Sequence, residues 1–436
     1  MSDNKKINLP KSKDLSPTSN IHLPTPKLPE LMAPAGDWTM LRAAVSNGAD
    51  AVYFGVDKLN MRAKAKNFSV DDLKEISSFC KQNNVKTYLT LNTIVFEEEL
   101  QEVEEIILKA KDAGIDRIIC WDLAVAELCY KHQFPFVIST QGSISNSLAA
   151  SVYKRLGAVR IVLARECSLE EIKKIRANTD LEIEAFIHGA MCIAISGRCF
   201  MSHHLFGQSA NRGECVQPCR REYEVIDSAT EKSLIIGEDY VMSPKDLCTI
   251  EFIDQLIEAG IDSFKIEGRK RAPEYVAKVV SVYRKAIDLY FEGNLTTEIK
   301  KQFLKELETV YNRGFSTGFY FGVPSSEDYA GVEGSKATTR KVYVGKVLNY
   351  YKQPEVVHIL IESGKVKAGD KIIFIGETTG VIESEITKMR VNEIENTEAV
   401  KGDEITLPLQ YLVRRNDKVY LIENLISQKI ITLPEH

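Results

Sequence analysis

Long apolar runs and an excess of basic residues are both missing from this sequence of 436 residues. A membrane-spanning helix needs about 20 consecutive apolar residues, and the sequence has no such run, so we expect no membrane partner. The chain has 56 Lys plus Arg against 61 Asp plus Glu, a formal net charge of -5. A protein with this charge balance does not attract nucleic acid over its whole surface, so any RNA partner has to be bound by a local basic patch. The 44% hydrophobic and 27% charged content excludes a disordered or fibrous protein.

The motifs of several common enzyme classes are also missing. No GxGxxG follows the first predicted strand, which disfavours a dinucleotide-binding fold. The HExxH of zinc peptidases does not occur. The GxSxG pattern of serine hydrolases occurs once, at Gly314–Gly318, but a Ser- and Gly-rich stretch follows it rather than a helical pattern, so we expect no nucleophile elbow there. The chemistry therefore has to come from other residues.

Residues 1–29 differ in composition from the rest of the chain. They contain five prolines and show no apolar periodicity, so we expect a disordered leader. The leader has neither the apolar core of a secretory signal nor the arginines of a transit peptide. The expected compartment is the cytoplasm, where thiols stay reduced and clustered cysteines indicate a metal site or catalysis rather than disulfides.

Short apolar runs alternate with amphipathic helical patterns across residues 30–322, which we expect to form the catalytic domain. Eight such runs predict parallel strands covered by helices on their outer face. Eight strand–helix units favour a (β/α)8 TIM-like barrel, an α/β fold, over an open doubly wound sheet. The predicted strands begin at Glu30, Ala49, Val85, Ile115, Pro135, Ala158, Leu181 and Ile261.

Active sites of such barrels lie at the carboxyl ends of the strands. Polar side chains gather at these ends, whereas the strand bodies are apolar. A basic run after the eighth strand suits a phosphate or a carboxylate, with an ordinary solvated turn as an equal alternative. The polar residues noted at strand ends include Asn92, Gln141, Arg165, His188, Lys265, Glu267, Arg269, Lys270 and Arg271.

The alternation stops after the seventh strand, where we expect residues 190–240 to form a cysteine-rich insertion. Five of the nine cysteines lie within 57 residues, while the other four are isolated in helices or strands, as buried thiols are. Clustered thiolates at a barrel mouth can bind an iron–sulfur cluster or zinc. The spacing matches neither a zinc ribbon nor a bacterial ferredoxin, so structural or redox thiols remain alternatives. The five are Cys192, Cys199, Cys215, Cys219 and Cys248.

Several motifs resemble those of peptidase family U32, the collagenase-like peptidases. The stretch from Glu184 to Ser202 is similar to the defining motif of that family. Further similar motifs occur in the same order, namely ANRGECVQPCR, SPKDLC, KIEGR and NRGFSTGF, and the segment ELMAPAGDWTMLRAAVSNGADAVYFGV precedes them. The resemblance runs from about residue 30 to about residue 330 and extends to the tail.

The resemblance implies two kinds of activity. Some U32 members are named proteases of unknown mechanism, whereas others act in the hydroxylation of a tRNA wobble uridine, of ribosomal RNA or of ubiquinone precursors. For the hydroxylating members it implies a [4Fe–4S] cluster and an oxygen-independent or prephenate-dependent route. We therefore expect an enzyme that converts a tRNA wobble uridine to 5-hydroxyuridine, with tRNA and a small dicarboxylate such as prephenate as partners. A collagenase-like peptidase is the alternative, and a cluster-bearing binding protein without catalysis is a third possibility.

The same resemblance implies the ligands of the cluster. Cys192, Cys199 and Cys248 are the expected ligands, with Cys215 as the fourth and Cys219 as an alternative to it. This sequence contains all five cysteines, so the choice stays open.

Four arginines are the expected substrate-binding residues. Arg62 stands where the family has a similar arginine, with an ordinary loop charge as the alternative. Arg212 and Arg220 lie within the cysteine segment, and Arg271 belongs to the basic run after the eighth strand. We expect these residues to form a rim for a phosphate or a carboxylate.

Four residues at the strand ends are the expected catalytic residues: His188, Lys265, Glu267 and Arg269. Glu267 could orient an arginine or act as a base, with a buried ion pair to Lys265 as an equal alternative. In the peptidase alternative, Cys192 is the nucleophile and His188 its base. The neighbouring cysteines make thiolate ligation the more economical account.

Residues 341–436 contain short alternating strands separated by Gly-Asp turns, which predict a small all-β barrel. The Ser- and Gly-rich residues 323–340 are the expected linker. The tail is similar to the small β-barrel of translation factors, which suits contact with tRNA, and a purely structural role is the alternative. The sequence leaves open whether the chain forms a homo- or hetero-oligomer.

Overall fold

The computed structural model describes residues 25–195, 197–221, 223–226, 228–230, 233–236, 242–330 and 334–425. Of the predicted leader, residues 1–24 lie outside this part, as do portions of the predicted insertion and the last residues of the tail. Among the described helices, none has both the length and the apolar character needed to cross a membrane.

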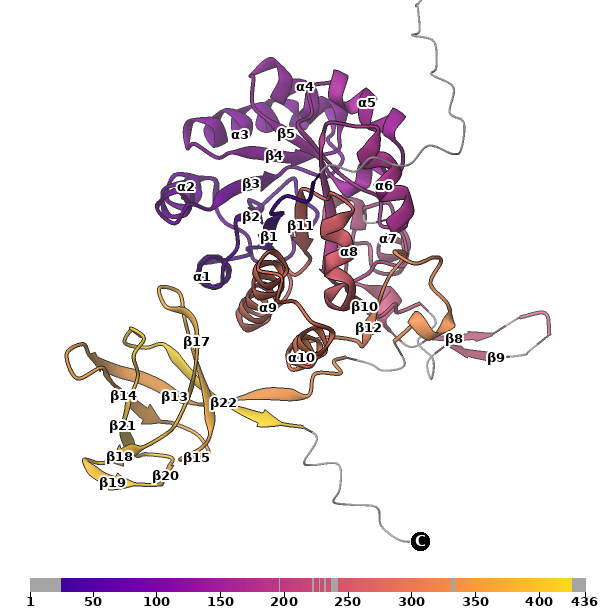
Figure 1. Ribbon diagram of the computed structural model, residues 1–436. Helices are drawn as coiled ribbons and strands as arrows, with labels where there is room; N and C mark the ends of the chain where they lie inside the picture. The colour runs from indigo at the N-terminus through magenta and orange to yellow at the C-terminus, as the bar shows by residue number, and fades with distance from the viewer. Residues whose placement is uncertain are drawn as a thin grey trace, which may run out of the picture.

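Eight parallel strands close into a barrel, which confirms the predicted (β/α)8 fold (Figure 1). Closure occurs because the last strand pairs in parallel with both the first and the seventh. The barrel strands are β1 (Glu30–Pro34), β2 (Ala51–Phe54), β3 (Lys86–Thr90), β4 (Arg117–Cys120), β5 (Phe136–Ile138), β6 (Arg160–Val162), β7 (Glu182–Gly189) and β11 (Ser263–Ile266).

Helices between these strands cover the outside of the barrel (Figure 1). Several of them begin with a side-chain cap, for example α6, where Ser168 and Glu171 form a capping box. Each buries an apolar side against the sheet, as β-strands with two buried faces require. The helices are α1 (Trp38–Ser46), α2 (Leu73–Gln82), α3 (Leu100–Asp112), α4 (Leu123–Lys131), α5 (Ser147–Arg155), α6 (Leu169–Ala177), α8 (Ile253–Glu258), α9 (Pro273–Phe291) and α10 (Thr297–Glu308).

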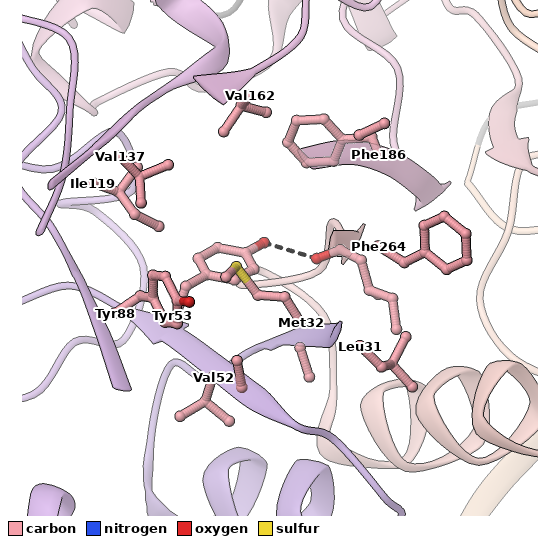
Figure 2. Packing of buried hydrophobic residues seen from close by; sticks show 14 of the residues in the cluster. Leu31, Met32, Val52, Tyr53, Tyr88, Ile119, Val137, Val162, Phe186 and Phe264 are labelled. Atoms are coloured by element: carbon pink, nitrogen blue, oxygen red, sulfur yellow. Dashed lines mark hydrogen bonds between the residues drawn. The ribbon is translucent and has the colours of Figure 1, made fainter. Parts of the chain in front are cut away.

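The barrel interior is a packed core rather than a channel. Figure 2 shows part of it, with Met32 and Tyr53 among buried residues from several strands. The Tyr53 hydroxyl donates a hydrogen bond of 2.9 Å to the backbone carbonyl of Ile266, across the β1 strand that lies between β2 and β11. This contact gives the buried hydroxyl a hydrogen-bond partner.

A layer of charged side chains lies deeper in the barrel. Arg160 is 2% exposed and contacts Glu30 at 2.6 Å and Glu184 at 3.0 Å. Glu184 also accepts a hydrogen bond of 2.7 Å from Lys265. Because every charge in this layer has a partner, the layer can stay buried below the mouth of the barrel.

The segment after β7 returns to the barrel through one short strand, and a second short strand, from the chain after α10, pairs with it. β10 (Asp246–Cys248) pairs antiparallel with the end of β7, and β12 (Phe315–Ser316) pairs with β10. Between β7 and β10 lie α7 (Met201–Phe206), the 3-10 turns at 210–212 and 218–220, and the hairpin of β8 (Tyr223–Ile226) and β9 (Ser233–Ile236). In the predicted linker, Ala330 donates to the Ser243 carbonyl at 2.7 Å, so the described start of that segment packs on the residues just before β10.

The tail is an all-β unit, as predicted. Eight antiparallel strands form one sheet in the order β17-β16-β22-β13-β14-β21-β18-β19, and β15 pairs with β20 beside it. Their buried apolar side chains form a second core, separate from that of the barrel. The strands are β13 (Thr339–Tyr351), β14 (Val356–Ile361), β15 (Lys365–Lys367), β16 (Lys371–Gly376), β17 (Gly380–Glu385), β18 (Met389–Val391), β19 (Ile394–Asn396), β20 (Glu398–Val400), β21 (Glu404–Pro408) and β22 (Lys418–Asn424).

Two ion pairs join the tail to helix α9 of the barrel domain. Lys278 contacts Glu383 at 3.2 Å, and Lys341 contacts Glu274 at 2.8 Å. The start of β17 also lies against α1, where a Cβ atom on Gly380 would be 3.2 Å from the Cβ atom of Arg42. The two domains are therefore in direct contact (Figure 1).

Candidate functional site

A first cavity, called the mouth cavity below, opens at the carboxyl ends of the barrel strands. It encloses about 510 Å³, including its opening to solvent. Strand ends from around the barrel supply its walls, which is where barrel enzymes place their chemistry. Its polar lining residues are Tyr53, Arg62, Thr90, Asn92, Ser139, Thr140, Gln141, Arg165, Lys265, Glu267 and Arg269.

Arg269 lies in the wall of the mouth cavity and is only 4% exposed. It donates to the hydroxyl of Thr90 at 2.8 Å and to the side-chain oxygen of Asn60. Burial lowers the pKa of Arg269 to about 10, so the guanidinium stays charged at neutral pH. Its Nε atom is buried and has no hydrogen-bond partner among the described residues.

Glu267 and Lys265 have separate partners, so the ion pair that the sequence suggested between them does not form. Glu267 accepts a hydrogen bond of 3.0 Å from Arg62, whereas Lys265 binds Glu184 at 2.7 Å. Burial raises the pKa of Glu267, but the charges of Arg62 and Arg165 outweigh it and hold the pKa below its ordinary value. Glu267 is therefore an ionised carboxylate that orients Arg62, one of the roles predicted for it.

Cations outnumber carboxylates in the mouth cavity. Its charged lining residues are Arg62, Arg165, Lys265, Arg269 and Glu267, which gives four cations and one carboxylate. Glu184, which pairs with Lys265 from the barrel interior, can be counted as a second carboxylate. Two positive charges then remain in excess. A partly buried site with this balance favours an anionic ligand.

A second cavity, called the thiol cavity below, adjoins the first. It encloses about 770 Å³, including its opening, and four of the five clustered cysteines line it. Met61, Arg62 and Arg165 line both cavities and form their shared wall. The four lining cysteines are Cys192, Cys199, Cys215 and Cys219.

The four thiols are close enough to affect one another. Burial raises the pKa of Cys219, Arg220 opposes this, and the charges of Cys192, Cys215 and Cys199 raise the pKa further. Among the described residues, no three His, Cys, Asp or Glu side chains already converge tightly enough to hold a metal ion. The thiols therefore surround a shared space rather than meet at one point.

The cysteine segment is fixed to the barrel by contacts distant in sequence. Gly213 lies against the loop after β2, where a Cβ atom would be 2.1 Å from the carbonyl oxygen of Asn60. Arg212 forms an ion pair with Glu99 at the start of α3. Lys270, after β11, donates to the carbonyl of Cys215 at 2.9 Å. These contacts hold the thiols over the mouth of the barrel.

Cys248 lies apart from the other clustered cysteines. It is in β10, opposite His188 of β7, and its Sγ atom is 3.8 Å from the hydroxyl of Tyr283. Burial raises the pKa of Cys248 to about 12, so it is a protonated thiol in the core. It lines neither the mouth cavity nor the thiol cavity.

His188 is also a core residue. It is 1% exposed, and its Nδ1 atom lies 3.3 Å from the hydroxyl of Tyr283. Burial, helped by the charge of Arg271, lowers the pKa of His188 to about 3, so the imidazole is neutral. His188 lines neither cavity, whereas Cys192 lines the thiol cavity.

The four predicted substrate-binding arginines divide between different places. Arg62 lines both cavities, and Arg220 lines the thiol cavity, where it donates to the Ser243 hydroxyl at 3.1 Å. Arg212 is occupied by the ion pair that anchors the segment. Arg271 lies over the ring of Tyr311 at 3.8 Å and faces the space between the two domains.

Arg165 is a site residue that the sequence placed at a strand end but to which we assigned no catalytic or binding role. It ends the sixth strand segment, donates to the Ala190 carbonyl at 2.8 Å and lies over the Phe186 ring at 4.2 Å. Its Nε atom lacks a partner among the described residues. Its position at the end of a predicted strand was the signal in the sequence. That Arg165 lines both cavities depends on its packing against the β7 segment, which the sequence does not show.

Comparison with known proteins shows strong similarity over most of the chain. The sequence model of peptidase family U32 matches residues 36–330. An uncharacterized protease of Methanocaldococcus jannaschii is 42% identical over 91% of this chain and 99% of its own. A collagenase of Porphyromonas gingivalis is 41% identical over 90% of this chain and 97% of its own. The tRNA hydroxylation protein P1 of Bacillus subtilis is 42% identical over 80% of this chain and 84% of its own.

Proposed function

Because this chain belongs to peptidase family U32, whose members include a relative named as a tRNA hydroxylation protein, we propose that it is an RNA-modifying enzyme. The proposed reaction is hydroxylation of a tRNA wobble uridine to 5-hydroxyuridine. The observation that carries the proposal is the cationic mouth cavity beside four clustered thiols, with Arg62 and Arg165 in the shared wall. The proposed compartment is the cytoplasm, which keeps thiols reduced.

The side chains that line the thiol cavity are of the kind that binds a [4Fe–4S] cluster. Such clusters are held by four cysteine thiolates, and four cysteine side chains line this one cavity. The backbone N–H of Gln217 points to Cys215 Sγ at 3.4 Å, the kind of contact that stabilises a ligating sulfur. We propose Cys192, Cys199, Cys215 and Cys219 as the ligands, so Cys219 replaces Cys248. When bound, the cluster would supply electron transfer or a Lewis-acidic iron beside the mouth cavity.

The mouth cavity suits a small dicarboxylate co-substrate such as prephenate. Arginine binds carboxylates through paired N–H donors, and the Nε donors of Arg165 and Arg269 are without partners among the described residues. The ion pair with Glu267 fixes Arg62 at the boundary of the two cavities. These three arginines would hold two carboxylates in a fixed orientation.

Glu267 is better suited to positioning than to proton abstraction. A general base works best when its pKa lies near the working pH, and the surrounding arginines hold the pKa of Glu267 below its ordinary value. We therefore assign to Glu267 the orientation of Arg62. The buried Lys265, paired with Glu184, supplies fixed positive charge below the ligand.

The peptidase alternative rests on the relatives that are named as a protease and a collagenase. A cysteine peptidase needs a base beside its thiolate. His188, the base that this alternative assigns, contacts Tyr283 in the core and has a pKa of about 3. The geometry therefore favours RNA modification.

Nucleoside analysis tests the proposed function. Transfer RNA from a strain lacking this protein should contain no 5-hydroxyuridine derivatives by mass spectrometry, and the wild-type chain should restore them. Arg165→Gln should not restore them, because the variant loses a cation of the mouth cavity. The control Arg155→Gln changes an exposed arginine of α5 and should restore them fully. Persistence of these nucleosides in the deletion strain, with loss of a collagen-cleaving activity, would establish the peptidase instead.

A further inference from the structure

We propose that the cleft between the barrel and the tail binds the sugar–phosphate backbone of the RNA substrate. This inference rests on the proposed function and adds the surface on which the RNA lies. The cleft encloses about 1900 Å³, including its opening, between α9 on one side and β13 and β16 on the other. Because this volume includes open solvent, the cleft is a groove open at the surface rather than an enclosed pocket.

The cleft is positively charged although the chain as a whole is acidic. Six basic and three acidic side chains line it, an excess of three positive charges against a net charge of -5 for the whole chain. Each domain contributes half of the basic residues, so a strand in the cleft would meet positive charge on both sides. They are Lys270, Arg271 and Lys278 from the barrel domain and Arg340, Lys341 and Lys371 from the tail.

Two of the six basic side chains are available to phosphates, whereas the other four have partners within the protein. Lys371 is exposed, and Arg340 pairs with Glu423 at the surface with a side chain that is 52% exposed. An exposed ion pair contributes only about 0–1 kcal/mol, so a phosphate can replace its carboxylate at little cost. Each phosphate contact also releases condensed counterions, which favours binding.

The cleft adjoins the proposed site at one residue, Lys270. Lys270 lines both the cleft and the thiol cavity, and it donates to the carbonyl of Cys215. Arg62 and Arg165 then connect the thiol cavity to the mouth cavity. A backbone held in the cleft would therefore pass beside the thiols, and a base turned out of its stack could reach the mouth.

Binding of a tRNA transcript to the full-length protein tests this inference. Fluorescence anisotropy at several salt concentrations gives both the affinity and its salt dependence. We expect the double variant Arg340→Glu/Lys371→Glu to bind at least about tenfold more weakly, and the slope of log K against log salt to shrink by about 1.4–1.8, as expected for two lost phosphate contacts. The neutral variant Arg340→Gln/Lys371→Gln should show the same change in slope, so the result does not depend on how well the charge-reversed chain folds.

A matched control separates the cleft from general charge. Arg390→Glu/Lys401→Glu makes the same change in net charge on exposed tail residues that do not line the cleft, and it should bind tRNA as the wild type does. Equal effects of the two pairs, or no effect of the cleft variants, would overturn the inference. So would tight binding of polyglutamate that competes with tRNA, because the cleft would then accept acidic polypeptides.

The same measurements distinguish this inference from the proposed function. If wild-type protein binds tRNA through the cleft but restores no hydroxylated nucleoside, the proposed function fails and the cleft inference stands. If the cleft variants bind tRNA and restore the nucleosides like the wild type, the cleft inference fails and the proposed function stands.

Discussion

Burial separates the five clustered cysteines into two kinds at the scale of single residues. Cys192 is exposed, and Cys199, Cys215 and Cys219 are partly exposed, as accessible metal ligands need to be before they bind. Cys248 is buried, with its pKa raised to about 12 by that burial. Spacing in the sequence could not reveal this difference, because the position of Cys248 depends on the pairing of β10 with β7.

Iron binding tests the proposed ligand set. After anaerobic reconstitution with iron and sulfide, Cys219→Ala should retain less than about half of the wild-type iron, because a [4Fe–4S] cluster needs four thiolates. Cys248→Ala should retain the wild-type amount, since that side chain does not line the thiol cavity. Thermal unfolding of both apo-proteins controls for misfolding. Iron loss in Cys248→Ala with full retention in Cys219→Ala would reverse the assignment.

His188 should make stability depend on pH. Its pKa lies near 3 in the fold, against 6.5 ordinarily, because burial disfavours the charged ring. The contribution of the neutral ring to the free energy of unfolding is fully present above pH 6.5. It is lost progressively as the pH falls toward 3. At pH 5 the loss is about 2 kcal/mol, from about 1.4 kcal/mol for each pH unit below 6.5.

Denaturant unfolding at pH 7 and pH 5 measures this contribution. The variant His188→Gln should lose about 2 kcal/mol less than the wild type between the two pH values, although it is less stable at pH 7. The control His204→Gln changes an exposed histidine and should follow the wild-type profile. An unchanged pH dependence in His188→Gln would show that other groups control the acid sensitivity.

At the scale of elements, Gly213 allows the cysteine segment to pack closely against the loop after β2. It has a φ of 84°, and a Cβ atom would meet the Asn60 carbonyl at 2.1 Å. Gly207 is a matched control with a φ of 65° and no atom within 4 Å of the same position. Both Gly→Ala changes carry the cost of a left-handed backbone, about 1–2 kcal/mol, but only Gly213→Ala adds a steric clash.

We therefore expect Gly213→Ala to be more damaging than Gly207→Ala. The extra loss of stability should be about 1–3 kcal/mol, as for other overpacked sites, and it should appear in denaturant unfolding. The cysteines of the segment should also react faster with a thiol reagent in Gly213→Ala, because the segment moves off the loop after β2. Equal stability and equal thiol reactivity in the two variants would show that the contact does not fix the segment.

The elements of the barrel were predictable because their signal is local. Near-continuous apolar runs and the helical patterns between them indicated all eight strands in their order. Residue partners were not predictable in this way. Lys265 and Glu267 are two residues apart, yet their partners come from β7 and from the loop after β2. Only the closed barrel brings those segments to the same place.

At the scale of the whole molecule, the ion pair between Lys278 and Glu383 helps to set the position of the tail. We expect Lys278→Glu and Glu383→Lys each to loosen the tail, and the double swap to restore its position. The coupling should be about 0.5 kcal/mol, as for other partly exposed pairs, or about a twofold change in the rate of proteolysis between the domains. The control pair Lys365 and Glu398, within the tail, should have no such effect when swapped in the same way. Independent effects of the two changes would show that the pair does not couple the domains.

Closure of the barrel by its last strand has a consequence during synthesis of the chain. Strand β11 completes the barrel by pairing with both β1 and β7, and it follows all four cysteines of the thiol cavity in the chain. During synthesis those cysteines leave the ribosome before their cavity can exist. The nascent chain is therefore the stage at which the thiols are most open to oxidants and to wrong disulfides. Oxidative stress should damage newly made chains more than completed ones.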